Sequence, residues 1–268
     1  MPTHDHRTDI EVDGEHIAGT FVTPKPQTPG VLFLHGWGGS KEQYLSRARE
    51  IAALGCVCLT VDLRGHAGTL PLQQTVSREN NLRDALAAYD ALADHYGVDR
   101  NAIAVVGSSY GGYLASILTT MRPVKWLALR VPALYMDTGW DLPKTQLHTT
   151  QDLDAYRRSL VPAAENRALR ACAAFEGDVL IVESERDHVV PHAVISNYLD
   201  ACIQARSLTY RVIKGADHGL SEEAWQRSYT TLLVSWMTEM VFGAREIEAI
   251  EAPALPKAAV PEAPPQPG

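Results

Sequence analysis

The sequence predicts an α/β protein built on a mostly parallel, doubly wound sheet of about eight strands. The first observation behind this prediction is a series of short, continuously apolar runs, each of which suits a strand buried on both faces. The second is that segments with apolar residues at helical spacing lie between these runs. The third is an alternating pattern at the start of the chain, which predicts an antiparallel hairpin beside the parallel strands.

The elements follow in order along the chain. The hairpin is expected from residues 10–12 and 16–22, which flank Asp13-Gly14, a dipeptide typical of two-residue turns. The later strands are expected at residues 30–34, 56–61, 102–106, 126–131, 179–182 and, more weakly, 208–213. Helices are expected at residues 42–54, 78–95, 193–205 and 222–242, with another beginning near Tyr113.

Two intervals depart from this alternation. Residues 132–162 follow a strand without forming one obvious helix, and such an insertion at the carboxyl end of a parallel strand is typical of a small cap over a site. Residues 248–268 are rich in Pro, Ala and Glu, a composition that predicts a disordered tail. We therefore expect one domain over residues 1–247, with the cap inside it.

Composition excludes several classes of partner. The 268 residues carry a formal net charge of −8, which provides no electrostatic basis for binding nucleic acid or an anionic membrane. We see no signal-peptide pattern and no apolar run of the length that spans a bilayer. The four cysteines lack the spacing of redox or zinc pairs, so we expect them to be reduced and the protein to be cytoplasmic. We expect a monomer or homodimer.

The strongest chemical signal is the run Gly107-Ser108-Ser109-Tyr110-Gly111, which joins a predicted strand to a predicted helix. This is the strand–turn–helix context of the nucleophile elbow, a turn so tight that its neighbours must lack side-chain bulk. Only Ser109 has glycine two residues before and two residues after it. The motif therefore predicts Ser109 as a nucleophile, although a plain Gly/Ser turn is the alternative.

A serine nucleophile needs a base, and the base needs an orienting acid. His218 follows the last predicted strand, and Asp187 follows the strand before it, so both lie at the same edge of the sheet as Ser109. We expect His218 to be the base and Asp187 the acid. Glu183 and Glu185 remain alternatives for the acid.

An oxyanion intermediate also needs hydrogen-bond donors aimed at it. One donor is expected to be the backbone N–H of Tyr110, the residue after the nucleophile. The other should come from the glycine-rich loop at residues 35–40, which follows the first parallel strand. We assign it to Trp37, with Gly38 as the alternative.

Five segments together resemble the marker segments of the α/β-hydrolase superfamily: HGWGG at 35–39, DLRGH at 62–66, GSSYGG at 107–112, DHVVP at 187–191 and DHG at 217–219. The chain is most similar to the compact branch with dienelactone-hydrolase-like proteins, cinnamoyl/feruloyl-type esterases and prolyl-oligopeptidase-like catalytic domains. The resemblance implies an α/β-hydrolase fold over residues 10–242 and the triad Ser109, Asp187 and His218. One departure is that dienelactone hydrolases proper use a cysteine nucleophile. We expect Asp62 and Arg64 to brace the loop beside the oxyanion turn by ion pairing, with contact to the substrate as the alternative.

These residues predict a serine hydrolase acting on carboxylic esters with small, medium or aromatic acyl groups, without a metal or organic cofactor. A peptidase or amidase is the alternative enzyme, and a non-catalytic binding protein on the same fold is the alternative outside catalysis. Several residues could wall a substrate pocket or could equally be the cap's own packing. They are Tyr135, Met136, Trp140, Leu142, Leu147 and Val189.

Overall fold

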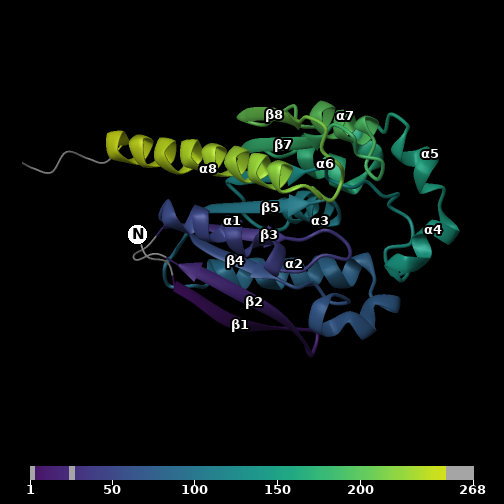
Figure 1. The fold of residues 1–268 in the computed structure, drawn as a ribbon, viewed down its shortest axis with the longest axis horizontal. Coiled ribbons are helices and arrows are strands. Elements are labelled where there is room, and N and C mark those ends of the chain that lie inside the picture. The colour runs from purple at the N-terminus through teal and green to yellow at the C-terminus, as the bar shows by residue number, and fades with distance from the viewer. Residues whose placement is uncertain (1–3, 24–27, 252–268) are drawn as a thin grey trace, which may run out of the picture.

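The computed structural model describes residues 4–23 and 28–251. Its centre is one eight-stranded sheet in the order β1-β2-β4-β3-β5-β6-β7-β8 (Figure 1). The strands are β1 His4–Val12, β2 Glu15–Thr23, β3 Thr28–Leu34, β4 Val57–Val61, β5 Val98–Ser108, β6 Trp126–Arg130, β7 Asp178–Ser184 and β8 Ser207–Ile213. All the expected strands are present, and the predicted fold class is confirmed.

The hairpin forms as the Asp13-Gly14 signal predicts. β1 pairs with β2 in antiparallel register, and Val12 lies opposite Glu15 across the two-residue turn. Asp13 and Gly14 both have positive φ, 54° and 78°, which is the conformation that such a hairpin turn requires. β2 then pairs antiparallel with β4, and every later pairing in the sheet is parallel.

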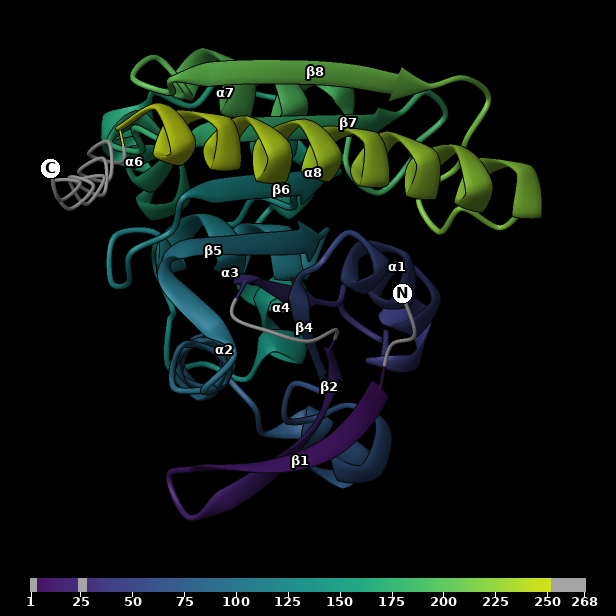
Figure 2. The same cartoon turned by 90° about the vertical axis from the view of Figure 1, so that its left-hand side faces the viewer.

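Helices cover both faces of the sheet (Figure 2). The larger ones are α1 Glu42–Ala53, α2 Arg78–Ala93, α3 Tyr110–Leu118, α6 Arg167–Ala173, α7 His192–Ala201 and α8 Glu223–Glu251. One apolar layer contains side chains of α2, α3, α6 and α7, and the other contains side chains of α1 and α8. Because the central strands β3 to β6 contribute to both layers, they are buried over most of their length, as their continuous apolar runs predict.

The insertion after β6 contains short helical segments joined by turns. Its elements are η2 Lys144–Gln146, α4 Leu147–Thr150, α5 Leu153–Arg157 and η3 Ala163–Glu165. It is held against the start of α2, because Pro143 forms a β-bridge with Ser77 and the backbone N–H of Lys144 donates to the carbonyl of Val76. Arg78, which is completely buried, donates to the carbonyl of Met136.

The last helix differs from the prediction at its end. α8 continues to Glu251, so residues 248–251 are helical rather than part of the expected tail. These residues include Glu and Ala, which are good helix formers, and Pro253 lies just beyond, where the helix cannot easily continue. The rest of the expected tail lies outside the described residues. No helix among the described residues is both long and apolar enough to cross a membrane.

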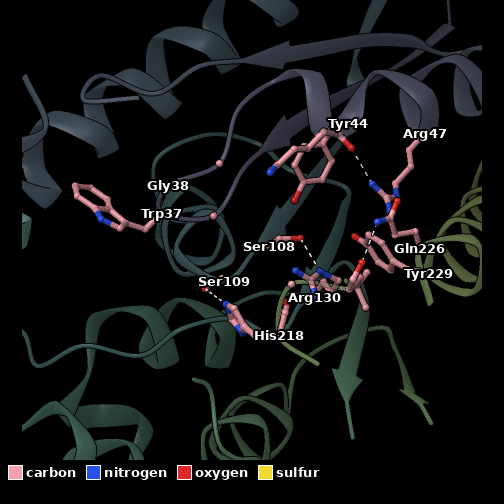
Figure 3. Close-up of a pocket in the computed structure, with 15 residues that line it drawn as sticks. Trp37, Gly38, Tyr44, Arg47, Ser108, Ser109, Arg130, His218, Gln226 and Tyr229 are labelled. Atoms are coloured by element: carbon pink, nitrogen blue, oxygen red, sulfur yellow. Dashed lines mark hydrogen bonds between the residues drawn. The ribbon is translucent and has the colours of Figure 1, made fainter. Parts of the chain in front are cut away.

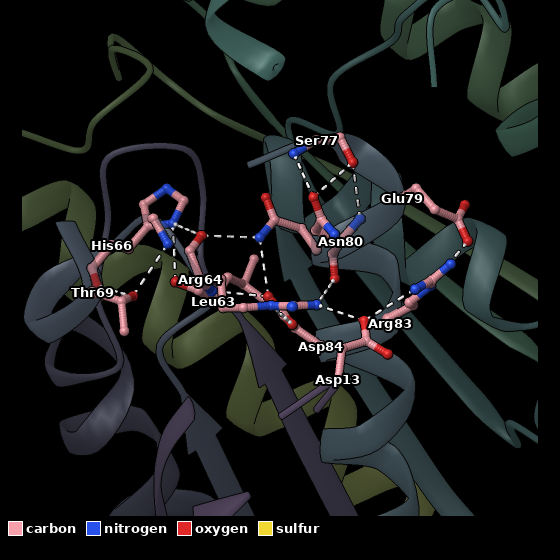
Figure 4. Close-up of polar contacts among 12 residues, drawn as sticks. Asp13, Leu63, Arg64, His66, Thr69, Ser77, Glu79, Asn80, Arg83 and Asp84 are labelled. Atoms are coloured by element: carbon pink, nitrogen blue, oxygen red, sulfur yellow. Dashed lines mark hydrogen bonds and ion pairs between the residues drawn. The ribbon is translucent and has the colours of Figure 1, made fainter. Parts of the chain in front are cut away.

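The segment after β4 is braced by ion pairs, but Asp62 and Arg64 do not pair with each other. Asp62 accepts from the Lys41 ammonium at 2.6 Å, at the start of α1. Arg64 donates through Nε to Asp84 of α2 at 2.6 Å, and these two side chains are 6% and 0% exposed. Arg64 also lies 3.4 Å from Asp13 in the hairpin turn (Figure 4). Residues 62–64 therefore connect the hairpin turn, the start of α1 and α2 through ion pairs.

Candidate active site

The turn at Ser109 has the backbone geometry of a nucleophile elbow. Ser109 lies between β5 and α3 with φ 51° and ψ −115°, a conformation that is strained for a residue with a side chain. A Cβ on Gly111 would lie 2.2 Å from the carbonyl oxygen of Leu34, and one on Gly107 would lie 2.5 Å from that of Gly111. The two glycines of the motif are thus required because α3 begins directly against β3 and β5.

The structure brings the three predicted side chains together (Figure 3 shows two of them). His218 Nε2 lies 3.1 Å from Ser109 Oγ, and His218 Nδ1 lies 2.6 Å from Asp187 Oδ2. The other carboxylate oxygen of Asp187 accepts from the backbone N–H groups of Val189 and Val190, both at 2.8 Å. The Asp187 side chain is only 2% exposed to water, so these three hydrogen bonds take the place of solvent around its carboxylate and fix its orientation.

The two alternative acids have other partners. Glu183 Oε1 lies 2.9 Å from His192 Nδ1, and its second oxygen accepts from the Tyr210 hydroxyl. Glu185 accepts from the Lys214 ammonium at 2.9 Å and from a backbone N–H. Among the residues that the structure describes, Asp187 is therefore the carboxylate in contact with His218.

The glycine-rich loop lies beside the nucleophile. A Cβ on Gly36 would lie 3.4 Å from Cβ of Ser109, and the Trp37 ring packs edge-on against the Tyr110 ring with 5.4 Å between centroids. Within the described part of the chain, the backbone N–H groups of Trp37 and Tyr110 donate to no backbone acceptor.

His35 supports this loop from behind. It is completely buried; its Nε2 accepts from the backbone N–H of Leu63 at 3.0 Å, and its Nδ1 donates to the carbonyl of Gly36 at 2.8 Å. Burial disfavours the charged imidazolium and lowers the pKa of His35 to about 4. The ring is therefore neutral near pH 7, and its tautomer follows from the two hydrogen bonds.

A cavity of about 290 Å³ opens beside Ser109 and His218. It extends toward α1 and α8 at the carboxyl edge of the sheet, and its lining includes the glycine-rich loop. The remaining polar side chains in its lining are Gln43, Tyr44, Arg47, Ser108, Arg130, Gln226 and Tyr229. None of the predicted pocket residues of the insertion is part of this lining, nor is Val189.

Those predicted pocket residues lie elsewhere. Tyr135 and Leu147 are buried in the apolar layer on the α2 and α3 side. The Trp140 ring stacks on Tyr113, and Leu142 and Val189 are 37% and 50% exposed. The aromatic insertion residues therefore pack against α3 and form part of the insertion's own packing rather than the wall of this cavity. The cavity beside Ser109 is instead lined by the glycine-rich loop, the loop at His218 and residues of α1, β5, β6 and α8.

The polar residues that line this cavity outside the triad were not predicted from the sequence. Arg130 could have been noticed, because it is a charged residue at the carboxyl end of an apolar strand, the same edge at which Ser109 lies. Arg47 and Tyr229 carry no such signal, since they lie on amphipathic helices where a polar residue is ordinary. No group of three or more His, Cys, Asp or Glu residues in the described ranges is placed to hold a metal ion.

Comparisons with known proteins identify relatives in sequence and in fold. The chain is 34% identical to a pimeloyl-[acyl-carrier protein] methyl ester esterase of Chromobacterium violaceum over 157 residues, 57% of this chain and 56% of the relative. It superposes on the ferulic acid complex of Est1E from Butyrivibrio proteoclasticus with a TM-score of 0.66 at 19% identity, covering 90% and 99% of the two chains. For an acylaminoacyl peptidase of Pyrococcus horikoshii the TM-score is 0.67 at 16% identity, with 89% of this chain and 42% of that chain covered.

The sheet order, the elbow and these superpositions define the fold as that of the α/β hydrolases, as the resemblance implies. The model of the prolyl oligopeptidase family matches residues 42–243, well over half of the sequence. The chain belongs to the prolyl oligopeptidase family. It spans only a little over half the length of the Chromobacterium esterase.

Proposed function

We propose that this protein is a serine hydrolase that cleaves carboxylic esters through an acyl-enzyme on Ser109. The observation that carries the proposal is the continuous hydrogen-bonded chain from Ser109 Oγ through the His218 ring to Asp187. A serine hydroxyl is a weak nucleophile unless a base removes its proton during attack, and this arrangement supplies the base.

In the proposed reaction, Ser109 Oγ attacks the acyl carbon while His218 Nε2 takes the hydroxyl proton. Asp187 holds the ring so that Nδ1 carries its hydrogen toward the carboxylate, and it stabilises the imidazolium that forms. The imidazolium then donates its proton to the departing alcohol oxygen. Water attacks the resulting acyl-Ser109 with His218 again as base. The imidazolium returns this proton to Ser109 Oγ as the acyl C–O bond breaks, and the carboxylic acid leaves.

The oxyanion of each tetrahedral intermediate would be bound by the backbone N–H groups of Trp37 and Tyr110. Support comes from Trp37, which lines the cavity together with Ser109, and from Tyr110, which directly follows Ser109 in the chain. Neither N–H group has a backbone acceptor in the described structure. Such preorganised donors stabilise developing negative charge without reorganising, and removing one typically lowers kcat by about 10²–10³-fold.

A peptidase or amidase is the second candidate, and the family match is the observation that favours it. Two observations favour the ester reaction instead. The relative at 34% identity is named as a methyl ester esterase. The cavity lining contains no carboxylate among the described residues, so it offers no anion to bind the free amino terminus of a peptide.

The test is the hydrolysis of 4-nitrophenyl acetate by the wild type and by Ser109→Ala. We expect the substitution to reduce kcat/KM by at least about 10³-fold, because the nucleophile is removed. Ser228→Ala, an exposed serine on α8, is the matched control and should retain full activity. The acyl group should also be found on the peptide containing Ser109 by mass spectrometry.

Equal turnover by the wild type and Ser109→Ala would refute the proposal. Parallel assays with short-chain 4-nitrophenyl esters and aminoacyl-4-nitroanilides separate the two candidate reactions. A higher kcat/KM on the anilides would establish the peptidase alternative in place of the esterase.

A further inference from the structure

Two arginines converge on one ring inside the cavity beside Ser109. The Cζ atom of Arg130, on β6, lies 5.7 Å from the ring centroid of Tyr229, and that of Arg47, on α1, lies 5.0 Å from the same centroid. All three residues line the cavity together with Ser109 and His218 (Figure 3). Two like charges near one ring oppose each other unless an anion lies close to both.

No carboxylate within the described ranges compensates either arginine. Neither Arg47 nor Arg130 forms an ion pair there, and no Asp or Glu lines the cavity. The contrast with the rest of the molecule is clear, because the chain as a whole has a net charge of −8. Burying an uncompensated cation is unfavourable, so a site of this kind is suited to a ligand that brings the negative charge.

Hydrogen-bonding capacity in the cavity is also unused. Arg47 Nε and the Tyr229 hydroxyl are buried and make no hydrogen bond of ordinary geometry in the described structure, although the hydroxyl lies close to Ser108. Arg47 donates through another guanidinium nitrogen to the carbonyl of Gln43 at 2.9 Å. Tyr229 itself is 2% exposed, and burial raises its pKa to about 12, so the hydroxyl is a donor near pH 7. The two donors belong to residues of α1 and α8 that line the same cavity.

Arg130 connects this space to the triad. Its Nε donates to Ser108 Oγ at 3.2 Å, one residue before the nucleophile, and its NH1 nitrogen (Nη1) donates to the carbonyl of His218 at 2.9 Å. Its own carbonyl accepts from the backbone N–H of Ser109 at 2.9 Å. Because Arg130 contacts the backbone of Ser109 and His218, one substrate molecule could place its anionic group at Arg130 and its ester carbonyl at Ser109.

We propose that the cavity is an anion subsite, and that the preferred substrates are esters bearing a carboxylate or phosphate group held by Arg47, Arg130 and the Tyr229 hydroxyl. The inference rests on the proposed function and narrows its substrate class. Arginine suits this role because its planar guanidinium donates two parallel hydrogen bonds to a carboxylate or phosphate.

The test compares two esters that differ in charge and little in shape, mono-4-nitrophenyl glutarate and methyl 4-nitrophenyl glutarate. We expect the wild type to have a kcat/KM at least about tenfold higher for the anionic ester. A charge-assisted hydrogen bond typically changes an affinity by about tenfold or more. Arg47→Gln should reduce this ratio toward one, and Arg47→Lys should retain part of it.

Arg49→Gln is the matched control. Arg49 lies on the same helix, is half-exposed and pairs with Asp5, outside the cavity, so the ratio should equal that of the wild type. Arg130→Gln is less suitable as the main variant because Arg130 also supports the His218 loop. A wild-type ratio near one, or an unchanged ratio in Arg47→Gln, would overturn the anion subsite while leaving the hydrolase proposal intact.

Binding without turnover separates the two proposals further. Calorimetric titration of the Ser109→Ala protein with glutarate and, in a second arm, with inorganic phosphate should show binding that Arg47→Gln weakens by about tenfold. The arm that binds identifies the anion as carboxylate or phosphate. Absence of binding in both arms would overturn the subsite even if ester hydrolysis by Ser109 is found.

Discussion

At the scale of single residues, the site depends on side chains whose hydrogen bonds leave them one orientation. Asp187 is held by two backbone N–H groups and by His218, and His35 is held by one donor and one acceptor. The two differ in charge. Asp187 meets only donors, which suits an anion, whereas His35 is buried with a single acceptor carbonyl and is therefore neutral.

His35 makes stability depend on pH. Its pKa is about 4 in the folded protein and about 6.5 in the unfolded chain, so between these values only the unfolded chain binds the proton. Stability is therefore fully present above pH 6.5 and falls as the pH decreases toward 4, by about 2–3 kcal/mol at pH 4.5. Urea unfolding at pH 7.5 and 4.5 measures this loss.

The matched variant is His35→Asn, which keeps polar atoms but does not titrate. The loss of unfolding free energy between pH 7.5 and 4.5 should be smaller in this variant than in the wild type by about the same 2–3 kcal/mol. Identical losses in the two proteins would show that His35 does not retain its low pKa in the folded state.

At the scale of elements, the position of Ser109 depends on how closely α3 approaches the sheet. A Cβ added to Gly111 would lie 2.2 Å from the carbonyl oxygen of Leu34 and 2.6 Å from that of His35, at the end of β3. The obstacle is backbone, which cannot rotate away as a flexible side chain would. The same contact fixes the glycine-rich loop relative to the nucleophile, since that loop begins at His35.

We therefore expect Gly111→Ala to lower the free energy of unfolding by about 2–3 kcal/mol, because α3 must move away from β3. The proposed ester hydrolysis should fall with it, since Ser109 and Trp37 would separate. Gly243→Ala is the control, because no atom lies within 4 Å of the Cβ it would add. Alanine there should be neutral or stabilise α8 by up to about 1 kcal/mol. Equal stabilities of the two variants by urea denaturation would contradict this account.

At the scale of the whole molecule, one sheet separates two apolar layers, and the candidate site lies where its strands end. The α2, α3, α6 and α7 layer takes up the aromatic residues of the insertion. The α1 and α8 layer leaves a polar cavity near Ser109, lined by residues from both helices. Because every central strand belongs to both layers, we expect the two layers to unfold together.

Leu114 on α3 and Leu233 on α8 test this expectation, since both are completely buried, one in each layer. Replacing either by alanine should lower the free energy of unfolding by about 2–5 kcal/mol. The two losses should add in the double variant, because the residues share no layer. Circular dichroism and tryptophan fluorescence should report one common transition, and two separate transitions would contradict a single cooperative unit.

Much of the architecture follows from the sequence because its causes are local. The Asp13-Gly14 turn sets the hairpin, and continuous apolar runs mark strands covered on both faces. The elbow is equally local, since Ser109 and its two glycines are adjacent along the chain. The predicted end of the last helix, at residue 242, was less accurate, since α8 continues to Glu251. Helix ends are difficult to predict because they fray and depend on small differences in propensity.

Choices among distant residues were made only by the tertiary structure. Three acidic residues follow β7 or end it, and the fold brings Asp187 to His218 while Glu183 and Glu185 find other partners. The cavity is the clearest case. Arg47 and Arg130 are 83 positions apart in the sequence, and only the packing of α1 and α8 against the sheet edge brings them together at Tyr229. The sequence by itself thus determined the fold class and the candidate nucleophile, because short-range pattern and backbone sterics decide both. The chemistry surrounding that nucleophile was decided by contacts between elements that no local pattern encodes.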